Sequence, residues 1–293
     1  MSPELIAFVN TGLVPIGLML IMFSMGLTLR LGDFGLLIAK RWTVLAGLGG
    51  QLVLMPLLAL SIGWLLQLPP QYALGLFILG ICPAGTTSNA LTFVGRGNVA
   101  LAVVLTALSS LITVFSIPIL LSWALPHFAV GGTIPKLSIP DVMMQLVRIT
   151  VLPIAIGMAI RRFLPALADR ASRWLRPVSL IVLIAVIAFA IGISIDMVLA
   201  NLVGAGPAIL LLNVAAMAAG LGIARLIRAS DADAMTLAIE VGVHNVTLAT
   251  FLTLTVLDSL PLAVTQNIYG VVMILNAMLL IRWFRPRLAG AGA

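Results

Sequence analysis

Two short polar segments interrupt apolar runs that are otherwise typical of membrane spans. The first, GICPAGTTSN at positions 80–89, lies between the apolar runs YALGLFIL and ALTFV. The second, EVGVHNVT at positions 240–247, places a carboxylate, an imidazole, an amide and a hydroxyl in an equally apolar stretch. Carboxylate, amide and hydroxyl oxygens and free carbonyls bind hard cations, and the N-termini of half-helices attract anions. The residue types therefore indicate binding of an ion beside a polar or anionic solute.

Each segment is expected to split one helix into two halves. Pro83 lacks an N–H and disfavours the helical conformation at the residue before it, and Gly85 frees the backbone. Ser88 or Asn89 is then expected to cap the second half-helix, while Gly242 is the breaker in the other segment. An unpaired backbone group in hydrocarbon costs several kcal/mol, so such breaks are expected only where protein covers them or a wet cavity reaches them.

Glu240 is an acidic residue well inside an apolar run, and ionisable groups in this position are usually functional. The alternative is a structural carboxylate paired with a neighbouring hydroxyl. His244 follows four residues later, which puts both side chains on one face if the helix continues, although a lone histidine can also be a satisfied core residue. Asn89 and Asn245 can cap half-helices, bind a ligand, or do both.

The elements that must hold these residues are membrane-spanning helices. Of the 293 residues, 62% are hydrophobic and 9% are charged, which excludes a soluble domain of this size. The mean hydropathy is +1.23. Repeated apolar runs of about 20 residues indicate an all-α polytopic membrane protein. Nine spans are predicted, with these bounds: 10–29, 42–66, 71–95, 98–123, 142–160, 177–196, 206–226, 234–257 and 262–282.

The basic residues gather between alternate spans and so predict an orientation. One basic loop holds Arg30, Lys40 and Arg41, and another runs from Arg161 to Arg176. By the positive-inside rule these loops face the cytoplasm, which places the N-terminus outside and the C-terminus inside the plasma (inner) membrane. The net charge of +7 is then explained by topology and not by a nucleic-acid partner. The single cysteine excludes an internal disulfide framework.

The two broken spans occupy corresponding places in a predicted inverted repeat. Span three, which contains 82–89, crosses from outside to inside, and span eight, which contains 240–247, crosses the other way. Spans one to four and six to nine then form two opposite-facing halves, with span five between them. Paired interruptions of this kind are the best sequence indication of where a transporter binds its cargo.

Several motifs resemble those of the bile acid:sodium symporter family. CPAGTTSNALTFVGRGNVAL and EVGVHNVTLA look like its two crossover motifs, and FSMGLTL (23–29) and QLVLMP (51–56) resemble its earlier helices. The resemblance extends over nearly the whole chain and is closest in form to nine-helix members. It implies a core formed by 42–123 and 206–282, with crossovers at 82–89 and 240–247, packed on a panel formed by 10–29 and 142–196.

The same resemblance implies two sodium sites. The first would use Ser88, Asn89, Thr106 and Glu240, and the second Gln51, Glu240, His244 and the carbonyls of Val241 and Val243. Two departures from the family pattern each remove an oxygen ligand, because Ala102 stands where a serine is common and His244 where a glutamine is common. We therefore expect one or two sodium ions, with one site weakened or lost and a proton on His244 partly taking its role.

These features predict a secondary active transporter of a small organic anion, cation-coupled and working by alternating access. By resemblance the solute is bile-acid-like, keto-acid, pantoate-like or sulfonated, and it is expected beside the following residues: Thr86, Thr87, Asn89, Asn245, Gln266 and Asn267. Gln266 and Asn267 could equally be interhelical contacts. The alternatives are a proton-coupled or uncoupled carrier or exporter and, more distantly, an intramembrane enzyme. The lipid bilayer is the expected surrounding, and the oligomeric state is left open.

Overall fold

The computed structural model of the protein describes residues 8–128, 137–193 and 195–290. Within these ranges the chain forms helices and turns, with one isolated antiparallel backbone bridge and no strand, so the all-α prediction is confirmed. The elements follow one another in this order: η1 (Val9–Leu13), α2 (Val14–Gly26), η2 (Leu31–Gly35), α3 (Leu36–Ala39), α4 (Arg41–Gly49), η3 (Gly50–Leu54), α5 (Met55–Leu65), α6 (Pro70–Ile81), α7 (Thr86–Val94), α8 (Val99–Phe128), α9 (Ile139–Leu146), η4 (Val147–Val151), α10 (Leu152–Phe163), α11 (Pro165–Ile193), α12 (Ile195–Leu226), α13 (Asp231–Gly242), α14 (Val246–Phe251), η5 (Leu252–Val256) and α15 (Leu260–Gly290).

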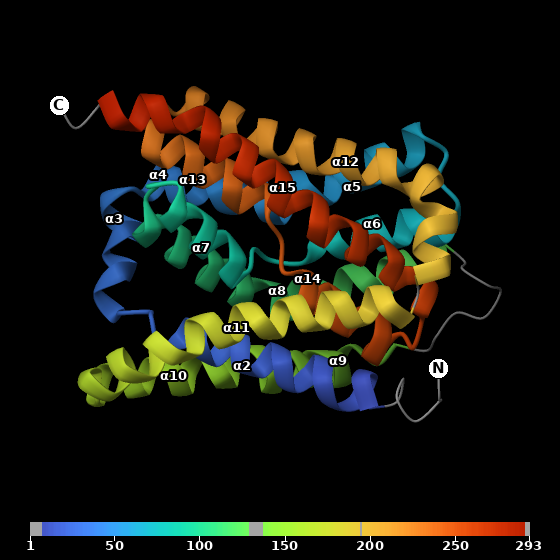
Figure 1. Ribbon diagram of the computed structural model, residues 1–293, viewed down its shortest axis with the longest axis horizontal. Helices are drawn as coiled ribbons and strands as arrows, with labels where there is room; N and C mark the ends of the chain where they lie inside the picture. The colour runs from blue at the N-terminus through green and yellow to red at the C-terminus, as the bar shows by residue number, and fades with distance from the viewer. Residues whose placement is uncertain (1–7, 129–136, 194, 291–293) are drawn as a thin grey trace.

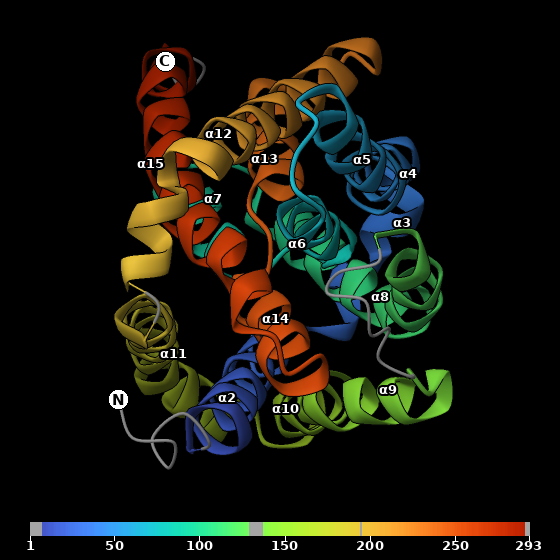
Figure 2. The ribbon, with the colours of Figure 1, turned by 90° about the vertical axis from the view of Figure 1, so that its right-hand side faces the viewer.

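The long helices lie side by side along the long axis of the molecule (Figure 1). Helices α2, α10 and α11 pack on one another along one side, as the end-on view in Figure 2 shows. We name these three, with α9 and η4, the panel helices. The remaining long helices, which include both broken pairs, are named the core helices, and α8 against α9 and α14 against α2 are contacts between the groups. That the two groups move as separate bodies stays a prediction.

The two broken helices, α6–α7 and α13–α14, cross at their breaks (Figure 1). The backbone N–H of Asn245 donates to the carbonyl of Pro83 at 2.8 Å, and Ala84 and His244 form the antiparallel bridge. A Cβ at Gly85 would lie 3.3 Å from the Cα of Asn245, which is why a residue without a side chain suits this approach. Each break therefore supplies backbone partners to the other.

The capping predicted for the second half of span three is wrong. Helix α7 begins at Thr86 with Gly85 in the N-cap position, and no side chain caps it. Ser88 lies one turn inside the helix, so its hydroxyl faces the carbonyl of Gly85 and the site described below. In span eight, by contrast, Asn245 does cap α14, because its Oδ1 accepts the N–H of Leu248 at 3.0 Å.

Five helices of the described residues are long and apolar enough to cross a membrane alone. A sixth span results if the pair Thr11–Gly26 and Leu31–Ala39, bent by 73°, is counted as one. The broken spans appear only as short pieces such as Pro70–Ile81 and Val246–Val256, because each half is about half of the roughly 20 residues that a spanning helix needs. The membrane-helical class is confirmed, and the count of nine spans stays a prediction.

Four turns contain a non-glycine residue in the left-handed region, and their positions are paired. Gln67 and Arg228 follow predicted spans two and seven, and Arg96 and Asp258 follow spans three and eight. In the first three turns the next N–H bonds to the carbonyl five residues earlier, which is the usual closure of a helix C-terminus. In the fourth, which follows the wider helix η5, the carbonyl lies six residues earlier. This correspondence supports the inverted repeat, which itself stays a prediction.

Three of the π-helical turns have an identifiable cause in the sequence. Helices η1, η3 and η4 each end two residues before a proline, at Pro15, Pro56 and Pro153. Proline cannot donate to the carbonyl four residues earlier, and a widened turn relaxes that mismatch. Helix η3 carries Gln51, so one residue of the predicted sodium sites lies on such a widened turn.

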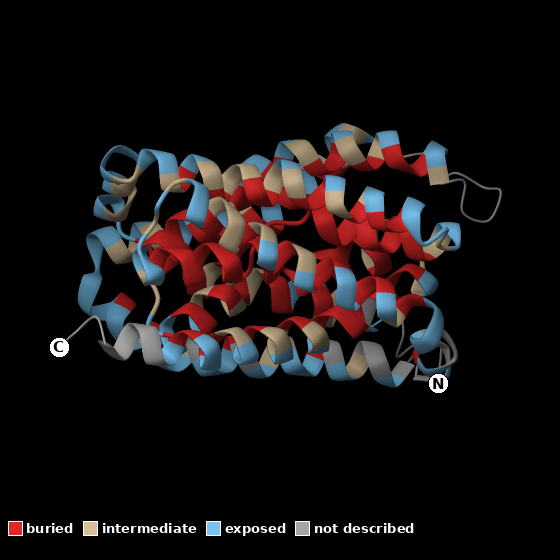
Figure 3. Ribbon diagram, turned by 90° about the horizontal axis from the view of Figure 1, so that it is seen from above, coloured by how far each residue is buried: buried red, intermediate tan, exposed pale blue. Residues whose placement is uncertain are grey.

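Two helices extend beyond their predicted spans, and one predicted loop is wrong. Helix α11 starts at Pro165 and not at 177, and α12 starts at Ile195, so the loop expected between spans six and seven is helical. The segment from 196 to 203 has no proline or glycine to stop a helix, and prolines 177 and 207 lie inside the helices. Buried residues gather in the middle of the molecule and exposed ones along its outer helices (Figure 3). Many of the exposed residues are large and apolar, as expected for a surface that meets lipid.

Arg161 connects three of the panel helices. Its Nε donates to the carbonyl of Leu27, just after α2, at 2.5 Å, and its Nη1 donates to Asp169 in α11. Asp169 precedes the predicted span 177–196, and the hydrogen bond from Arg161 holds the pKa of this exposed carboxyl below its usual range. Solvent screening keeps the contribution of such an exposed pair small.

Replacing Asp169 with asparagine should lower the melting temperature slightly at pH 7. A carboxyl whose pKa is lowered by folding stabilises the protein above its unfolded pKa of about 3.9. That stabilisation is lost as the pH falls through the folded value. The difference between wild type and Asp169→Asn should therefore shrink from pH 7 to pH 3. Asp141→Asn, at an exposed carboxylate of α9, is the control, and an equal pH-dependent difference there would contradict the link.

Candidate functional site

Glu240 is completely buried at the crossing, and side chains from three other helices lie within hydrogen-bond distance of its carboxylate. Ser88 Oγ of α7 lies 2.5 Å from Oε1, and Thr106 Oγ1 of α8 and Gln51 Nε2 of η3 lie 3.1 Å and 3.2 Å from Oε2. No basic side chain among the described residues forms an ion pair with it. A buried carboxylate costs several kcal/mol unless it meets a cation or a proton. The structure thus brings predicted ligands from both halves of the chain onto one carboxylate.

The hydroxyls beside Glu240 have fewer protons than acceptors. Ser88 Oγ lies 2.6 Å from the carbonyl of Gly85 as well as beside the carboxylate. Thr106 Oγ1 lies 3.3 Å from Asn89 Oδ1 in the same way. Each hydroxyl has one proton and two acceptor neighbours, so one contact in each pair lacks a proton. A cation among these oxygens, or a proton on the carboxylate, would balance the site.

The oxygen atoms around Glu240 are of the types that bind sodium. Gln51 is 1% exposed and its Oε1 has no hydrogen-bond partner, so the amide leaves one more oxygen free beside Glu240. The described residues contain no group of three or more His, Cys, Asp or Glu side chains that could hold a metal ion. One carboxylate with several neutral oxygens suits a hard monovalent cation better than a transition metal. Ala102, one turn before Thr106 on α8, adds no oxygen.

His244 lies between the two breaks with each ring nitrogen at a backbone carbonyl. Nδ1 is 2.8 Å from the carbonyl of Cys82, and Nε2 is 2.9 Å from that of Val241. A neutral imidazole has one N–H and can donate to only one of these acceptors, whereas a ring carrying two protons can donate to both. The carbonyl of Val241, a predicted sodium ligand, is therefore already in contact with the ring.

The shared helical face predicted for Glu240 and His244 is wrong. Helix α13 ends at Gly242, and Val243 has the extended conformation, with φ −115° and ψ 99°. The four-residue spacing therefore does not span a helical turn. The break turns the imidazole toward the other crossover, and Glu240 stays on the helix with its carboxylate toward α7 and α8.

The N-terminus of α7 has no capping side chain, and we call it open for that reason. It lies beside the side-chain amide of Asn245. The N–H groups of Thr86 and Thr87 are the first of the helix and have no acceptor four residues earlier in it. Asn245 lies against the N-cap Gly85, and its Nδ2 is buried without a partner. These are all hydrogen-bond donors, at the positive end of a helix dipole.

The remaining predicted solute residues lie on α15. Gln266 Nε2 donates to the carbonyl of Gly75 at 3.1 Å, so this amide contacts the first half of span three and not the break. Asn267 is fully buried, and neither its Nδ2 nor its Oδ1 has a partner. A solute-binding role for both stays a prediction, and the Gln266 contact has the form of the interhelical alternative.

Sequence reasoning missed two residues that contact the break in span eight and a third that contacts one of them. Asn213 and Tyr269 both donate to the carbonyl of Gly242, and Asn276 donates to Asn213. None belongs to a recognisable motif. The available signal was the single asparagine in the apolar run AILLLNVAAM (208–217), since an isolated polar residue in a span usually has a polar partner.

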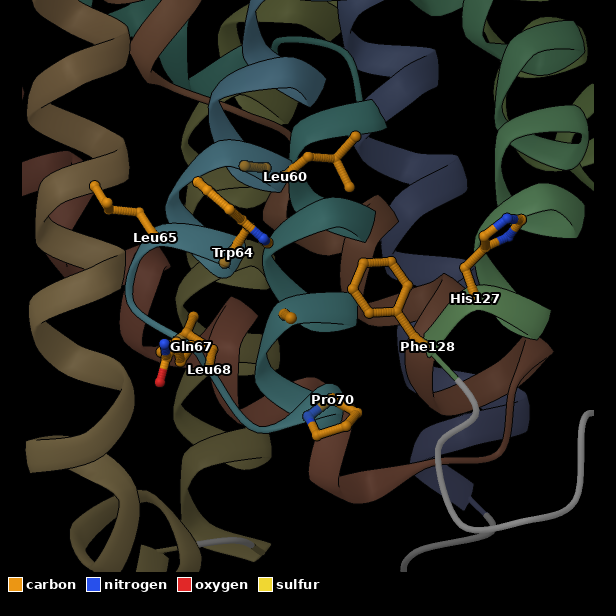
Figure 4. Close-up of a pocket in the computed structure, with 11 residues that line it drawn as sticks. Leu60, Trp64, Leu65, Gln67, Leu68, Pro70, His127 and Phe128 are labelled. Carbon is orange, nitrogen blue, oxygen red and sulfur yellow. The ribbon is translucent and has the colours of Figure 1, made fainter.

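A cavity of about 730 Å³ lies away from this site, at the ends of α5, α6 and α8 (Figure 4). Its walls include Trp64, Leu68, His127 and Phe128, and none of the predicted ion or solute residues lines it. A volume of this size could hold a small molecule, but the cavity is remote from the carboxylate and from the open helix terminus. We therefore assign the candidate site to the crossing.

Two broken helices that meet in the protein interior around a buried carboxylate define a class, the secondary membrane transporters. In that class, unwound helix ends contact both the coupling ion and the solute. Residues 15–201 match the family model described as the Sodium Bile acid symporter family, and the chain belongs to this family.

Comparison with individual proteins agrees with this family membership. The chain is 30% identical over 249 residues to the uncharacterized sodium-dependent transporter YocS of Bacillus subtilis (strain 168), covering 83% of this chain and 74% of that protein. It is 30% identical over 245 residues to the probable sodium/metabolite cotransporter BASS1, chloroplastic, of Arabidopsis thaliana, covering 84% of this chain and 60% of that protein. It is 36% identical over 145 residues to a sodium-dependent organic anion transporter of Rattus norvegicus, covering 47% and 37%. The chain thus spans less than two thirds of the second and third of these relatives.

Glu240→Gln should abolish stabilisation by sodium while keeping the shape of the side chain. A ligand that binds only the folded state at one hundred times its Kd stabilises by about 2.7 kcal/mol, so sodium should raise the melting temperature of the wild type. The variant should show no difference between sodium and choline chloride. Asp169→Asn, which also removes one negative charge but far from the crossing, should respond like the wild type. A full sodium response in Glu240→Gln would show that the carboxylate is structural.

Proposed function

We propose that the protein is a secondary active transporter that moves a small organic anion together with sodium. The observation that carries this proposal is the pairing of a buried carboxylate among proton-deficient oxygens with an open helix N-terminus at the same crossing. The first arrangement suits a cation and the second an anion. The family membership and the names of the relatives support sodium as the cation.

The solute carboxylate binds at the N-terminus of α7 in this proposal. Thr86 and Thr87 offer backbone N–H groups and hydroxyls, and Asn245 offers its unpaired Nδ2. Neither crossover segment, 82–89 or 240–247, contains a lysine or an arginine. Recognition of the solute would therefore rest on neutral donors and the helix dipole. This favours a monoanionic carboxylate among the predicted solutes. Asn89, whose Oδ1 contacts Thr106, would lie between the anion and the cation.

Sodium binds beside Glu240 in this proposal, with the hydroxyls of Ser88 and Thr106 and the amide oxygens of Asn89 and Gln51 available as ligands. The panel and core helices would move against each other to expose the crossing to either side of the plasma membrane, with the N-terminus outside. The turns at the left of Figure 1, at α3 and at the end of α10, carry arginine and lysine residues. Their position at one end supports that orientation.

Asn245→Leu should weaken solute binding and leave sodium stabilisation intact. The substitution removes the Nδ2 donor as well as the cap on α14, so a loss of about one hydrogen bond to a charged group, roughly 1.5–3 kcal/mol, is expected. Thr86→Val keeps the shape and removes one hydroxyl without touching a cap. The measurement is thermal stabilisation by pyruvate, pantoate and taurocholate in sodium. Unchanged stabilisation in both variants would move the solute site elsewhere.

The second cation position is occupied by the ring of His244 in our proposal. Its contacts with the carbonyls of Cys82 and Val241 would both be hydrogen bonds if the ring carried two protons, and the ring proton on Nε2 would then stand beside the Val241 carbonyl in place of sodium. One sodium ion per cycle would follow, with a proton partly taking the role of the other. This contact is also the observation that favours the second candidate function, a proton-coupled carrier of the same solutes.

Wild-type uptake should depend on sodium with a Hill coefficient near one, and His244→Gln should raise that coefficient toward two. Glutamine restores an amide oxygen where the imidazole stands, which is the ligand type that sodium prefers. Uptake into proteoliposomes at varied sodium, with and without an inward proton gradient, is the measurement. His127→Gln, at the other histidine, is the matched control. A wild type that already uses two sodium ions and ignores the proton gradient would refute the assignment.

A further inference from the structure

The carbonyl of Gly242 has both of its acceptor positions filled by side chains. Gly242 is the last residue of α13, where a broken helix leaves carbonyls without intrahelical partners. Asn213 Nδ2, from α12, donates to this carbonyl at 2.7 Å, and the hydroxyl of Tyr269, from α15, donates at 2.8 Å. The carbonyl is therefore unavailable to an ion or a solute, and its direction is fixed by two other helices.

The orientation of Asn213 is itself fixed. Asn276 Nδ2 donates to Asn213 Oδ1 at 2.8 Å, which turns the nitrogen of that amide toward Gly242. Asn213 and Tyr269 are fully buried, and Asn276 is half-buried. A buried amide whose two ends are both engaged holds a defined position, since either rotation of the amide would leave a donor or an acceptor unpaired.

Packing at the same point leaves Gly242 no freedom to move toward α12. Met217 follows Asn213 by one turn, and a Cβ at Gly242 would lie 2.3 Å from its Cγ. Helix α12 thus contacts the break twice, once through a hydrogen bond and once through a close apolar contact. The break is held from this side as Gln51 holds it from the other side, through Glu240.

We propose that Asn213, Tyr269 and Asn276 are positioning residues for the cation site, an inference that rests on the proposed function. The peptide bond is planar, so fixing the carbonyl of Gly242 also fixes the plane that joins Gly242 to Val243. Through that plane these three residues, which we name the clamp, set where the Glu240 carboxylate stands relative to Ser88 and Thr106. None of the three contacts the cation; they set the geometry of groups that do.

The clamp acts on the cation side of the crossing and not on the solute side. The backbone of Asn245 is held separately, by its N–H bond to the carbonyl of Pro83, and its side chain by the N–H of Leu248. Loss of the clamp should therefore reduce sodium affinity while the open N-terminus of α7 is preserved. A purely structural role would instead lower stability and leave the sodium affinity unchanged.

Tyr269→Phe is the sharpest test, because it removes one hydroxyl and keeps the ring that packs edge-on against His244 at 6.4 Å. The half-saturating sodium concentration for thermal stabilisation should rise about tenfold, as expected for one lost hydrogen bond of a buried group. Asn213→Leu should raise it further, and Asn276→Leu should raise it less, because Asn276 acts through Asn213. Tyr72→Phe, which also removes a tyrosine hydroxyl but near the start of α6 and away from Gly242, is the matched control and should keep the wild-type value.

Two outcomes separate this inference from the proposed function. If the wild type itself shows no stabilisation by sodium alone, the proposed cation site fails and the inference falls with it. If the wild type responds and Tyr269→Phe melts at a lower temperature in choline but keeps the wild-type half-saturating sodium concentration, the clamp is only structural and the inference is overturned. Tyr269→Phe also serves where Asn213→Leu fails to fold, since it leaves the amide pair in place.

Discussion

The site depends on backbone contact between two broken helices. A break in hydrocarbon is costly because its N–H and C=O groups lose their partners, and here Asn245 and Pro83, with the bridge between Ala84 and His244, supply partners across the crossing. One set of contacts thereby supplies hydrogen-bond partners to both breaks. It also fixes α13 relative to α7, which is what brings Glu240 within hydrogen-bond distance of Ser88 although 152 residues separate them.

In our proposal, the cation and the anion bind at this crossing to different parts of the chain. The cation side is built from side chains, with one carboxylate and several neutral oxygens. The anion side is built mostly from the backbone, at the first turn of α7, with the amide of Asn245 beside it. Because both sides share α7, a cation near Glu240 would strengthen the attraction for an anion at its N-terminus, and an anion would strengthen the attraction for the cation. This reciprocity is the physical basis of the coupling that we propose.

Much of this arrangement could be predicted from the sequence. The length of the apolar runs and the two polar interruptions identify the fold class, and the motifs, through their resemblance to the family, indicate Glu240, Ser88 and Thr106 as members of one site. The sequence could not show what depends on how the breaks meet. Ser88 does not cap α7, and His244 does not share a helical face with Glu240, because both expectations assumed ordinary helix geometry at the breaks. Asn213 and Tyr269 were missed because their partner is a carbonyl, which no sequence pattern displays.

The main-chain pairing of the two breaks has a consequence for how such a protein can diversify. The contacts that hold the crossing together run largely through peptide groups, which every residue type except proline provides in full. The side chains of Thr86 and Thr87 project from that scaffold without taking part in the backbone contacts between the breaks. They can therefore be exchanged while the scaffold persists, so cargo preference is free to drift, or to be redesigned, on an unchanged architecture.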